Sequence, residues 1–145
     1  MKVLLPVDGS EPALDAVRFA IRLASEGLPL QCVLGNVQQP ATLYEMVVAH
    51  GADVLLREAG IACESEVASG DAGHLLVEMA ERFGCDMVII SARGTGALRQ
   101  ALVGSVSQSV LHACPVPVLV VKPPRAPEAE ADELAESDEA ATPPG

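Results

Sequence analysis

Residues 2–27 read KVLLPVDGSEPALDAVRFAIRLASEG, and the spacing of the apolar residues changes once within this stretch. The first six residues form a short apolar run that ends at Asp8, which is typical of a buried strand. From Leu14 onward the apolar residues recur every three or four positions, which is the spacing of one helix face. Ser10 is the predicted N-cap of that helix and Pro12 suits its first turn. The stretch therefore predicts a strand followed directly by a helix.

The same alternation continues along the chain. Short apolar runs predict strands at residues 30–37, 61–68, 86–91 and 116–122, and helical spacing predicts helices over 41–59, 71–84 and 99–113. Aliphatic strands that alternate with helices are typical of a parallel sheet covered on both faces. We therefore expect an α/β, doubly wound, five-stranded parallel sheet with right-handed crossovers.

Charge divides the chain into two parts. Residues 126–145 carry seven acids and no base, whereas residues 1–125 carry thirteen acids and nine bases, within a formal net charge of −11. We expect one domain over residues 1–123 and an acidic, Pro/Ala-rich tail over 124–145 that is disordered, because the tail has too few apolar residues to order itself. A basic face for nucleic acid is not expected, and no apolar run is long enough to span a membrane.

Cysteine and histidine usage favours structural roles. The cysteines are widely spaced without a C-x-x-C pair, so we expect reduced thiols, and the N-terminus is too short for a signal-peptide core. Together these features predict a cytoplasmic protein. The histidines have no metal-like spacing, so no metal site is predicted. The residues concerned are Cys32, Cys63, Cys85, Cys114, His50, His74 and His112.

Residues 91–107, SARGTGALRQALVGSVS, follow the fourth predicted strand and are rich in glycine. Gly94 can adopt positive φ and bring backbone N–H groups close to a phosphate, and a helix starting near Gly104 would add a partial positive charge. In open α/β sheets, ligands bind beyond the carboxyl ends of strands where the strand order reverses. If the order is 3-2-1-4-5, the loop and Asp8 lie at that reversal. Asp8 would then accept from a base or sugar donor.

Established nucleotide motifs do not match this loop. The P-loop pattern fails because no Lys precedes Ser105, and the G-x-G-x-x-G pattern fails because Arg99 occupies the third glycine position. A plain turn remains an alternative for the loop, helix capping for Asp8, and a surface position for Arg93. A catalytic serine is not expected, because the sequence has no G-x-S-x-G motif.

Three quoted features together resemble the universal stress protein family, over roughly residues 1–123. They are PVDGSEPA at the end of the first strand, Gly94 followed after nine residues by Gly104-Ser105, and SVSQSVLHACPVPVLVVK near the C-terminal end of the domain. ATP-binding members carry G-x-x-G-(nine residues)-G-[ST]. Here Ser91 stands at the first glycine position. The resemblance places this chain nearest the ATP-binding type, with one departure from its motif.

The resemblance implies a sheet order of 3-2-1-4-5 and a homodimer formed through the last strand, Val116 to Val121. It also implies a stress-response regulator that binds ATP, alone or with Mg²⁺, with little or no hydrolysis, and that is not an enzyme in the usual sense. The alternative is a stress protein that binds no nucleotide and acts through protein contacts. The implied nucleotide-contacting residues are Pro6, Val7, Asp8, Val37, Ile90, Ser91, Arg93, Gly94, Gly104, Ser105, Val106 and Ser107.

Overall fold

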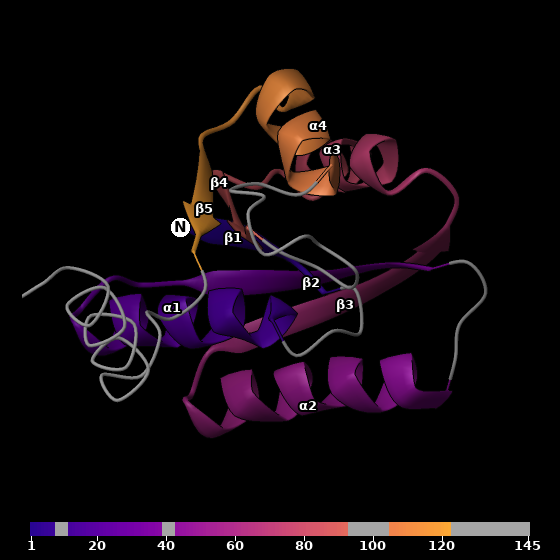
Figure 1. The fold of residues 1–145 in the computed structure, drawn as a ribbon. Coiled ribbons are helices and arrows are strands. Elements are labelled where there is room, and N and C mark those ends of the chain that lie inside the picture. The colour runs from indigo at the N-terminus through magenta and orange to yellow at the C-terminus, as the bar shows by residue number, and fades with distance from the viewer. Residues whose placement is uncertain (8–11, 39–42, 93–104, 123–145) are drawn as a thin grey trace, which may run out of the picture.

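The computed structural model describes residues 1–7, 12–38, 43–92 and 105–122. Within them the chain alternates regularly between strand and helix (Figure 1). The strands form one parallel sheet in the order β3-β2-β1-β4-β5, which confirms the predicted fold class and order. The elements are β1 (Lys2–Pro6), α1 (Ala13–Ser25), β2 (Gln31–Gln38), α2 (Leu43–Glu58), β3 (Ala62–Ser69), α3 (Ala72–Arg82), β4 (Met87–Ser91), α4 (Ser105–Ala113) and β5 (Val118–Val121).

The central strand β1 determines how the sheet is arranged. It pairs in parallel with β2, from Lys2 opposite Gln31 to Pro6 opposite Gly35, and on its other side with β4. The next connections run outward on one side, to β2 and β3, and then cross back to β4 and β5 on the other. The strand order therefore reverses between β1 and β4.

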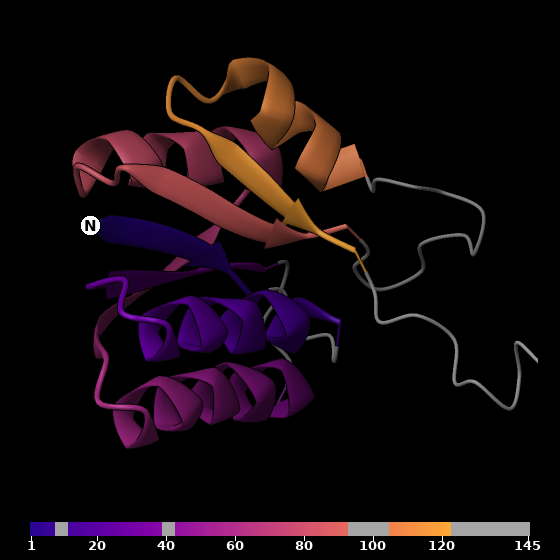
Figure 2. The same cartoon turned by 90° about the vertical axis from the view of Figure 1, so that its left-hand side faces the viewer.

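The two faces of the sheet are covered by separate pairs of helices (Figures 1 and 2). Val3, Leu5 and Val7 of the first strand pack with residues of α1 and α2, whereas Leu4 packs with residues of α3 and α4. This alternation follows from the two-residue period of a strand. Helices on both faces are thus confirmed.

The start of α3 agrees with the sequence prediction, and the start of α1 differs from it. Asp71 caps α3 as expected, because its Oδ2 accepts a hydrogen bond from the backbone N–H of His74 at 2.9 Å. The cap predicted at Ser10 is wrong, since Pro12 occupies the N-cap of α1 and is already in the right-handed helical region, without a side-chain cap. Proline has its φ fixed near the helical value, so the helix can begin without a hydroxyl cap.

Two glycines let α3 lie close to its neighbours, one against α4 and one against β2. A Cβ on Gly73 would lie 2.7 Å from the Cβ of Ser109, so α3 and α4 approach each other more closely than any larger residue permits. A Cβ on Gly35 would lie 3.0 Å from the Sδ of Met79, on the strand that α3 covers. These contacts set the position of α3 on the sheet, and through α3 that of α4.

All four cysteines are free thiols, as the sequence predicts. Cys32 and Cys85 are buried, whereas Cys63 and Cys114 are half-buried. None of the helices within the described ranges is both long and apolar enough to cross a bilayer.

Candidate functional site

The candidate site lies at the carboxyl edge of the sheet, where the strand order reverses. β1 and β4 are parallel neighbours, so Val7 and Ser91 follow or end their strands on the same edge. This is the position where open α/β sheets bind ligands. The sequence therefore predicted the location of the edge correctly.

A buried hydrogen bond joins this edge to the first turn of α4. The hydroxyl of Ser107 donates to the backbone carbonyl of Ser91 at 2.8 Å, and the Ser107 side chain is buried. The contact spans sixteen residues of chain. The hydrogen bond thus joins the end of β4 to the start of α4, and Figure 2 shows both on the same side of the molecule.

The first turn of α4 brings positive electrostatic potential to the edge. A helix N-terminus presents backbone N–H groups without intrahelical acceptors, and its dipole favours negative charge. Ser105 and Val106 begin the helix and are exposed, with Val106 38% exposed. The arrangement can accept an anionic group beside the end of β4.

Side chains at the ends of the strands are engaged in packing. Val7 belongs to the cluster under α1 and α2, and Ile90 belongs to the cluster under α3 and α4, together with the half-buried Val37. Pro6 is also buried, at the last position of β1. The backbone N–H of Val7 donates to Gly35 at 2.8 Å, which holds β1 and β2 together at this edge. These side chains make the floor of the edge part of the core.

Ser91 occupies its position without backbone strain. Within the described residues, no residue other than glycine has a positive φ. A glycine at position 91 is therefore not required by backbone conformation. The serine adds a Cβ and a hydroxyl at a buried point, where its side chain is 7% exposed.

The structure brings together only part of the predicted set. Eight of the predicted residues are described. Seven of them lie along the carboxyl ends of β1 and β4 and in the first turn of α4, and the eighth lies on β2: Pro6, Val7, Ile90, Ser91, Ser105, Val106, Ser107 and, on β2, Val37. Four predicted residues lie outside the described ranges: Asp8, Arg93, Gly94 and Gly104.

Asn36 is a polar residue at this edge to which the sequence assigned no role. It lies near the carboxyl end of β2, is 5% exposed, and follows the glycine that accepts from Val7. A polar residue inside the apolar run LQCVLGNV was the available signal, because buried amides need hydrogen-bonding partners.

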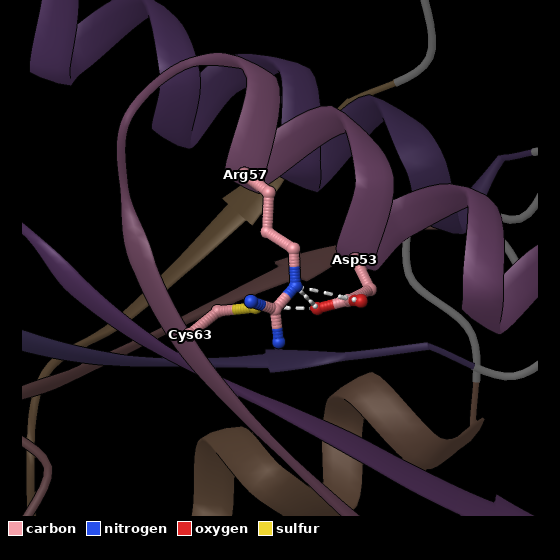
Figure 3. Close-up of polar contacts among 3 residues, drawn as sticks. All are labelled: Asp53, Arg57 and Cys63. Carbon is pink, nitrogen blue, oxygen red and sulfur yellow. Dashed lines mark hydrogen bonds and ion pairs between the residues drawn. The ribbon is translucent and has the colours of Figure 1, made fainter.

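A second polar cluster lies away from this edge, between α2 and β3 (Figure 3). The thiol of Cys63 donates to the carboxylate of Asp53 at 2.8 Å, and the Nε of Arg57 lies 2.9 Å from both oxygens of that carboxylate. Asp53 and Arg57 are one helical turn apart, which is a favourable spacing for an ion pair. The cluster fastens α2 to the edge strand of the sheet.

The thiol of this cluster and the buried thiol of Cys32 both have raised pKa values. Burial and the hydrogen bond to Asp53 raise the pKa of Cys63 to about 11, and burial raises the pKa of Cys32 to about 12. Both thiols are protonated at neutral pH and are therefore poor nucleophiles. The pKa of Asp53 is lowered by the Cys63 thiol and by Arg57, so this contact stabilises the fold at neutral pH and weakens as the pH falls through that lowered value.

Metal ligands do not gather anywhere in the part of the chain that the structure describes. No group of three or more His, Cys, Asp or Glu side chains there could hold a metal ion.

Comparison with known proteins assigns the family. The family model described as the universal stress protein family matches residues 1–122. The chain belongs to the universal stress protein family. A universal stress protein of Methanocaldococcus jannaschii is 29% identical over 141 residues, covering 86% of this chain and 83% of the relative.

Solved structures of universal stress proteins share the fold. One, in complex with cAMP, has a TM-score of 0.69 at 24% identity, covering 84% of this chain and 96% of that one. Another, from Arabidopsis thaliana with AMP bound, has a TM-score of 0.66 at 18% identity, covering 86% of this chain and 93% of that one. At these identities the likeness establishes the architecture of this universal stress protein and leaves its ligand to be argued from its own residues.

Replacing Ser107 with alanine is expected to loosen α4 from the edge. The substitution removes the buried hydrogen bond to the Ser91 carbonyl, which should lower the free energy of unfolding by about 1–2 kcal/mol. Urea unfolding followed by circular dichroism measures this. Ser109→Ala, an exposed position on the same helix, is the matched control and should change stability by less than about 0.5 kcal/mol. Equal losses in the two variants would show that the Ser107 bond is not what holds α4.

Two substitutions beside Cys63 should change its alkylation rate in opposite directions. Asp53→Asn removes the carboxylate that raises the Cys63 pKa, so iodoacetamide at pH 8 should modify Cys63 several-fold faster. Arg57→Gln removes a cation that lowers this pKa, so modification should slow. Peptide mass spectrometry reports the rate at each cysteine, with the half-buried Cys114 as the internal reference. Acceleration in both variants would mean that exposure of the thiol, rather than its pKa, limits the reaction.

Proposed function

We propose that this universal stress protein binds an adenine nucleotide at the carboxyl edge between β1 and β4. The observation that carries the proposal is the hydrogen bond from Ser107 to the Ser91 carbonyl, because it fixes a helix N-terminus beside the point of strand reversal. The universal stress proteins of the same fold that are solved with cAMP and with AMP support the choice of an adenine nucleotide.

Each part of the edge has a proposed role. The end of β1 contacts the adenine and ribose, with Asp8 accepting from the sugar and Val37 near the base. The end of β4 flanks the nucleotide through Ile90 and Ser91. The phosphates are bound by the glycine loop and the first turn of α4: Arg93, Gly94, Gly104, Ser105, Val106 and Ser107.

The proposed ligand is ATP, alone or with Mg²⁺, bound with little or no hydrolysis. The glycine spacing from Gly94 to Gly104-Ser105 is that of ATP-binding members of the family. Ser91 is compatible with this, because its backbone is unstrained and its carbonyl is what α4 contacts. We propose that the protein acts as a cytoplasmic stress-response regulator that reports nucleotide occupancy.

Nucleotide binding is tested first on the protein as purified. Heat denaturation followed by ion-exchange chromatography should release adenine nucleotide, and calorimetry should give micromolar binding of ATP. Gly104→Val places a branched side chain in the proposed phosphate loop and should weaken binding at least a hundred-fold.

Gly51→Val is the matched control for that substitution. It introduces the same side chain on α2, where a Cβ meets nothing within 4 Å, and should leave the affinity unchanged. Absence of released nucleotide together with no binding at millimolar ATP would refute nucleotide binding. It would favour the alternative function through protein contacts.

We further propose that the protein is a homodimer that pairs through its last strand, residues 116–121. Among the strands that the structure describes, β5 has a neighbour on one side only, and it carries Leu119, which is 37% exposed. Open, apolar strand edges favour pairing with a second chain. A dimer is compatible with both proposed functions: regulation by nucleotide binding, and action through protein contacts without a nucleotide.

A charge on β5 should separate the proposed dimer. Leu119→Glu places a carboxylate in the pairing surface, so light scattering after size-exclusion chromatography should give the monomer mass at micromolar concentration. Val67→Glu, on the opposite edge strand β3 at a 67% exposed position, is the control and should remain dimeric. A wild-type protein of monomer mass would refute the proposed pairing outright.

A further inference from the structure

The end of β5 lies directly beside the proposed nucleotide edge. Val121 is paired with Ser91, and the backbone N–H of Ala92 donates to the Val121 carbonyl at 2.8 Å. The Ser91 carbonyl in turn binds the hydroxyl of Ser107. The ends of β4 and β5 and the start of α4 therefore form one continuous edge, which Figure 2 shows from the side.

The acidic part of the chain is tethered at this edge. Lys122 follows β5 immediately and Arg125 comes three residues later. The seven acids of residues 126–145 follow both, with no base among them. Glu128 is six residues beyond Lys122, so no backbone conformation can carry it more than about 22 Å away. Asp132, ten residues beyond, is confined to about 36 Å. This bound is set by chain length alone.

The bound on Glu128 is within the range of charge effects at low ionic strength, and the bound on Asp132 is close to that range. The Debye length is about 30 Å at 0.01 M salt and about 8 Å at 0.15 M. Carboxylates confined to this volume lower the electrostatic potential at the first turn of α4, which otherwise favours anions. The remaining 125 residues carry only four more acids than bases, so most of the net negative charge of the molecule belongs to the segment that follows β5.

We propose that the acidic segment, residues 126–145, regulates the nucleotide edge by electrostatic repulsion and weakens binding in proportion to the negative charge of the ligand. The inference rests on the proposed function. The affinity of the site for nucleotides then depends on the ions in solution, because salt or divalent cations screen the segment and reduce the repulsion. Nucleotides with fewer phosphates, and ATP neutralised in part by Mg²⁺, gain relative to free ATP.

The test uses the full-length chain with its tail charges removed. Calorimetric titration at 20 mM NaCl should show ATP binding about ten-fold tighter than in wild type and AMP about three-fold tighter, with adenosine unchanged, since the effect scales with ligand charge. At 500 mM NaCl the two proteins should agree, because the Debye length falls below about 5 Å. With Mg²⁺ present, the ratio for ATP should fall towards that for AMP. The substitutions are Glu128→Gln, Glu130→Gln, Asp132→Asn, Glu133→Gln, Glu136→Gln, Asp138→Asn and Glu139→Gln.

A matched pair of three-charge variants separates tethered charge from net charge. Neutralising only the first three acids of the tail should tighten ATP binding two- to three-fold at low salt. Neutralising three acids near the C-terminal ends of α1, α2 and α3, at the opposite edge of the sheet, should change it by less than half that amount. The opposite-edge substitutions are Glu26→Gln, Glu58→Gln and Glu81→Gln.

The outcomes distinguish this inference from the proposed function. Equal affinity for ATP in the wild-type and tail-neutralised proteins at 20 mM NaCl would overturn the inference and leave nucleotide binding standing. Equal tightening of ATP and adenosine would also overturn it, because charge would not be the cause. Failure of both proteins to bind ATP at 5 mM, with and without Mg²⁺, would refute the proposed function and this inference with it.

Discussion

The central strand β1 is hydrogen-bonded on both sides and buried on both faces, and the rest of the molecule is built around that constraint. Val3, Leu4 and Leu5 are fully buried, each contributing about 1.5–3 kcal/mol of burial free energy. A shift of one residue in register would exchange the two faces and mismatch both core clusters at once. Because every neighbouring strand must be parallel to β1, each connection has to return across the sheet by a helix. All strand ends, and all helix starts, consequently lie on one edge.

In the described part of this edge, main-chain carbonyls accept hydrogen bonds, whereas the side chains at the strand ends pack in the core. Val7 and Ile90 are committed to opposite core clusters, so their side chains support the edge from below. The Ser91 carbonyl is engaged by Ser107, and the Val121 carbonyl is engaged by Ala92. Residue 91 contributes to this edge through its backbone carbonyl. A serine fits there because its φ angle is one that any residue adopts. Compared with a glycine, the serine at position 91 adds side-chain volume at a buried point and does not require a different path of the chain.

Sequence periodicity predicts the elements of this fold well, because strands and helices bury their faces with different repeats. The strands at 2–7 and 86–91 and the cap at Asp71 were all recoverable from local patterns. The start of α1 was not, because Pro12 is already helical and a hydroxyl at Ser10 merely resembles a cap. Contacts between distant residues were also beyond reach. Nothing local to Ser107 indicates that its partner is the carbonyl of Ser91, and nothing local to Cys63 indicates a carboxylate on α2.

The short helix α4 is the element on which the proposed function depends most, and it contacts β4 and α3 at different points. At its start the Ser107 hydroxyl donates a hydrogen bond to β4. Two residues later Ser109 packs against Gly73 of α3, so closely that a Cβ on Gly73 would not fit. Gly73 lies in the first turn of α3, which the Asp71 cap fixes beside the carboxyl end of β3. The edge strand β3 thus positions α3, and α3 in turn positions α4 at the point of strand reversal. A nucleotide that binds at the first turn of α4 would contact the helix that these interactions position. Under the proposed function, changes at β3 and α3 would therefore alter the affinity for the nucleotide without contacting it, through the position of one helix N-terminus.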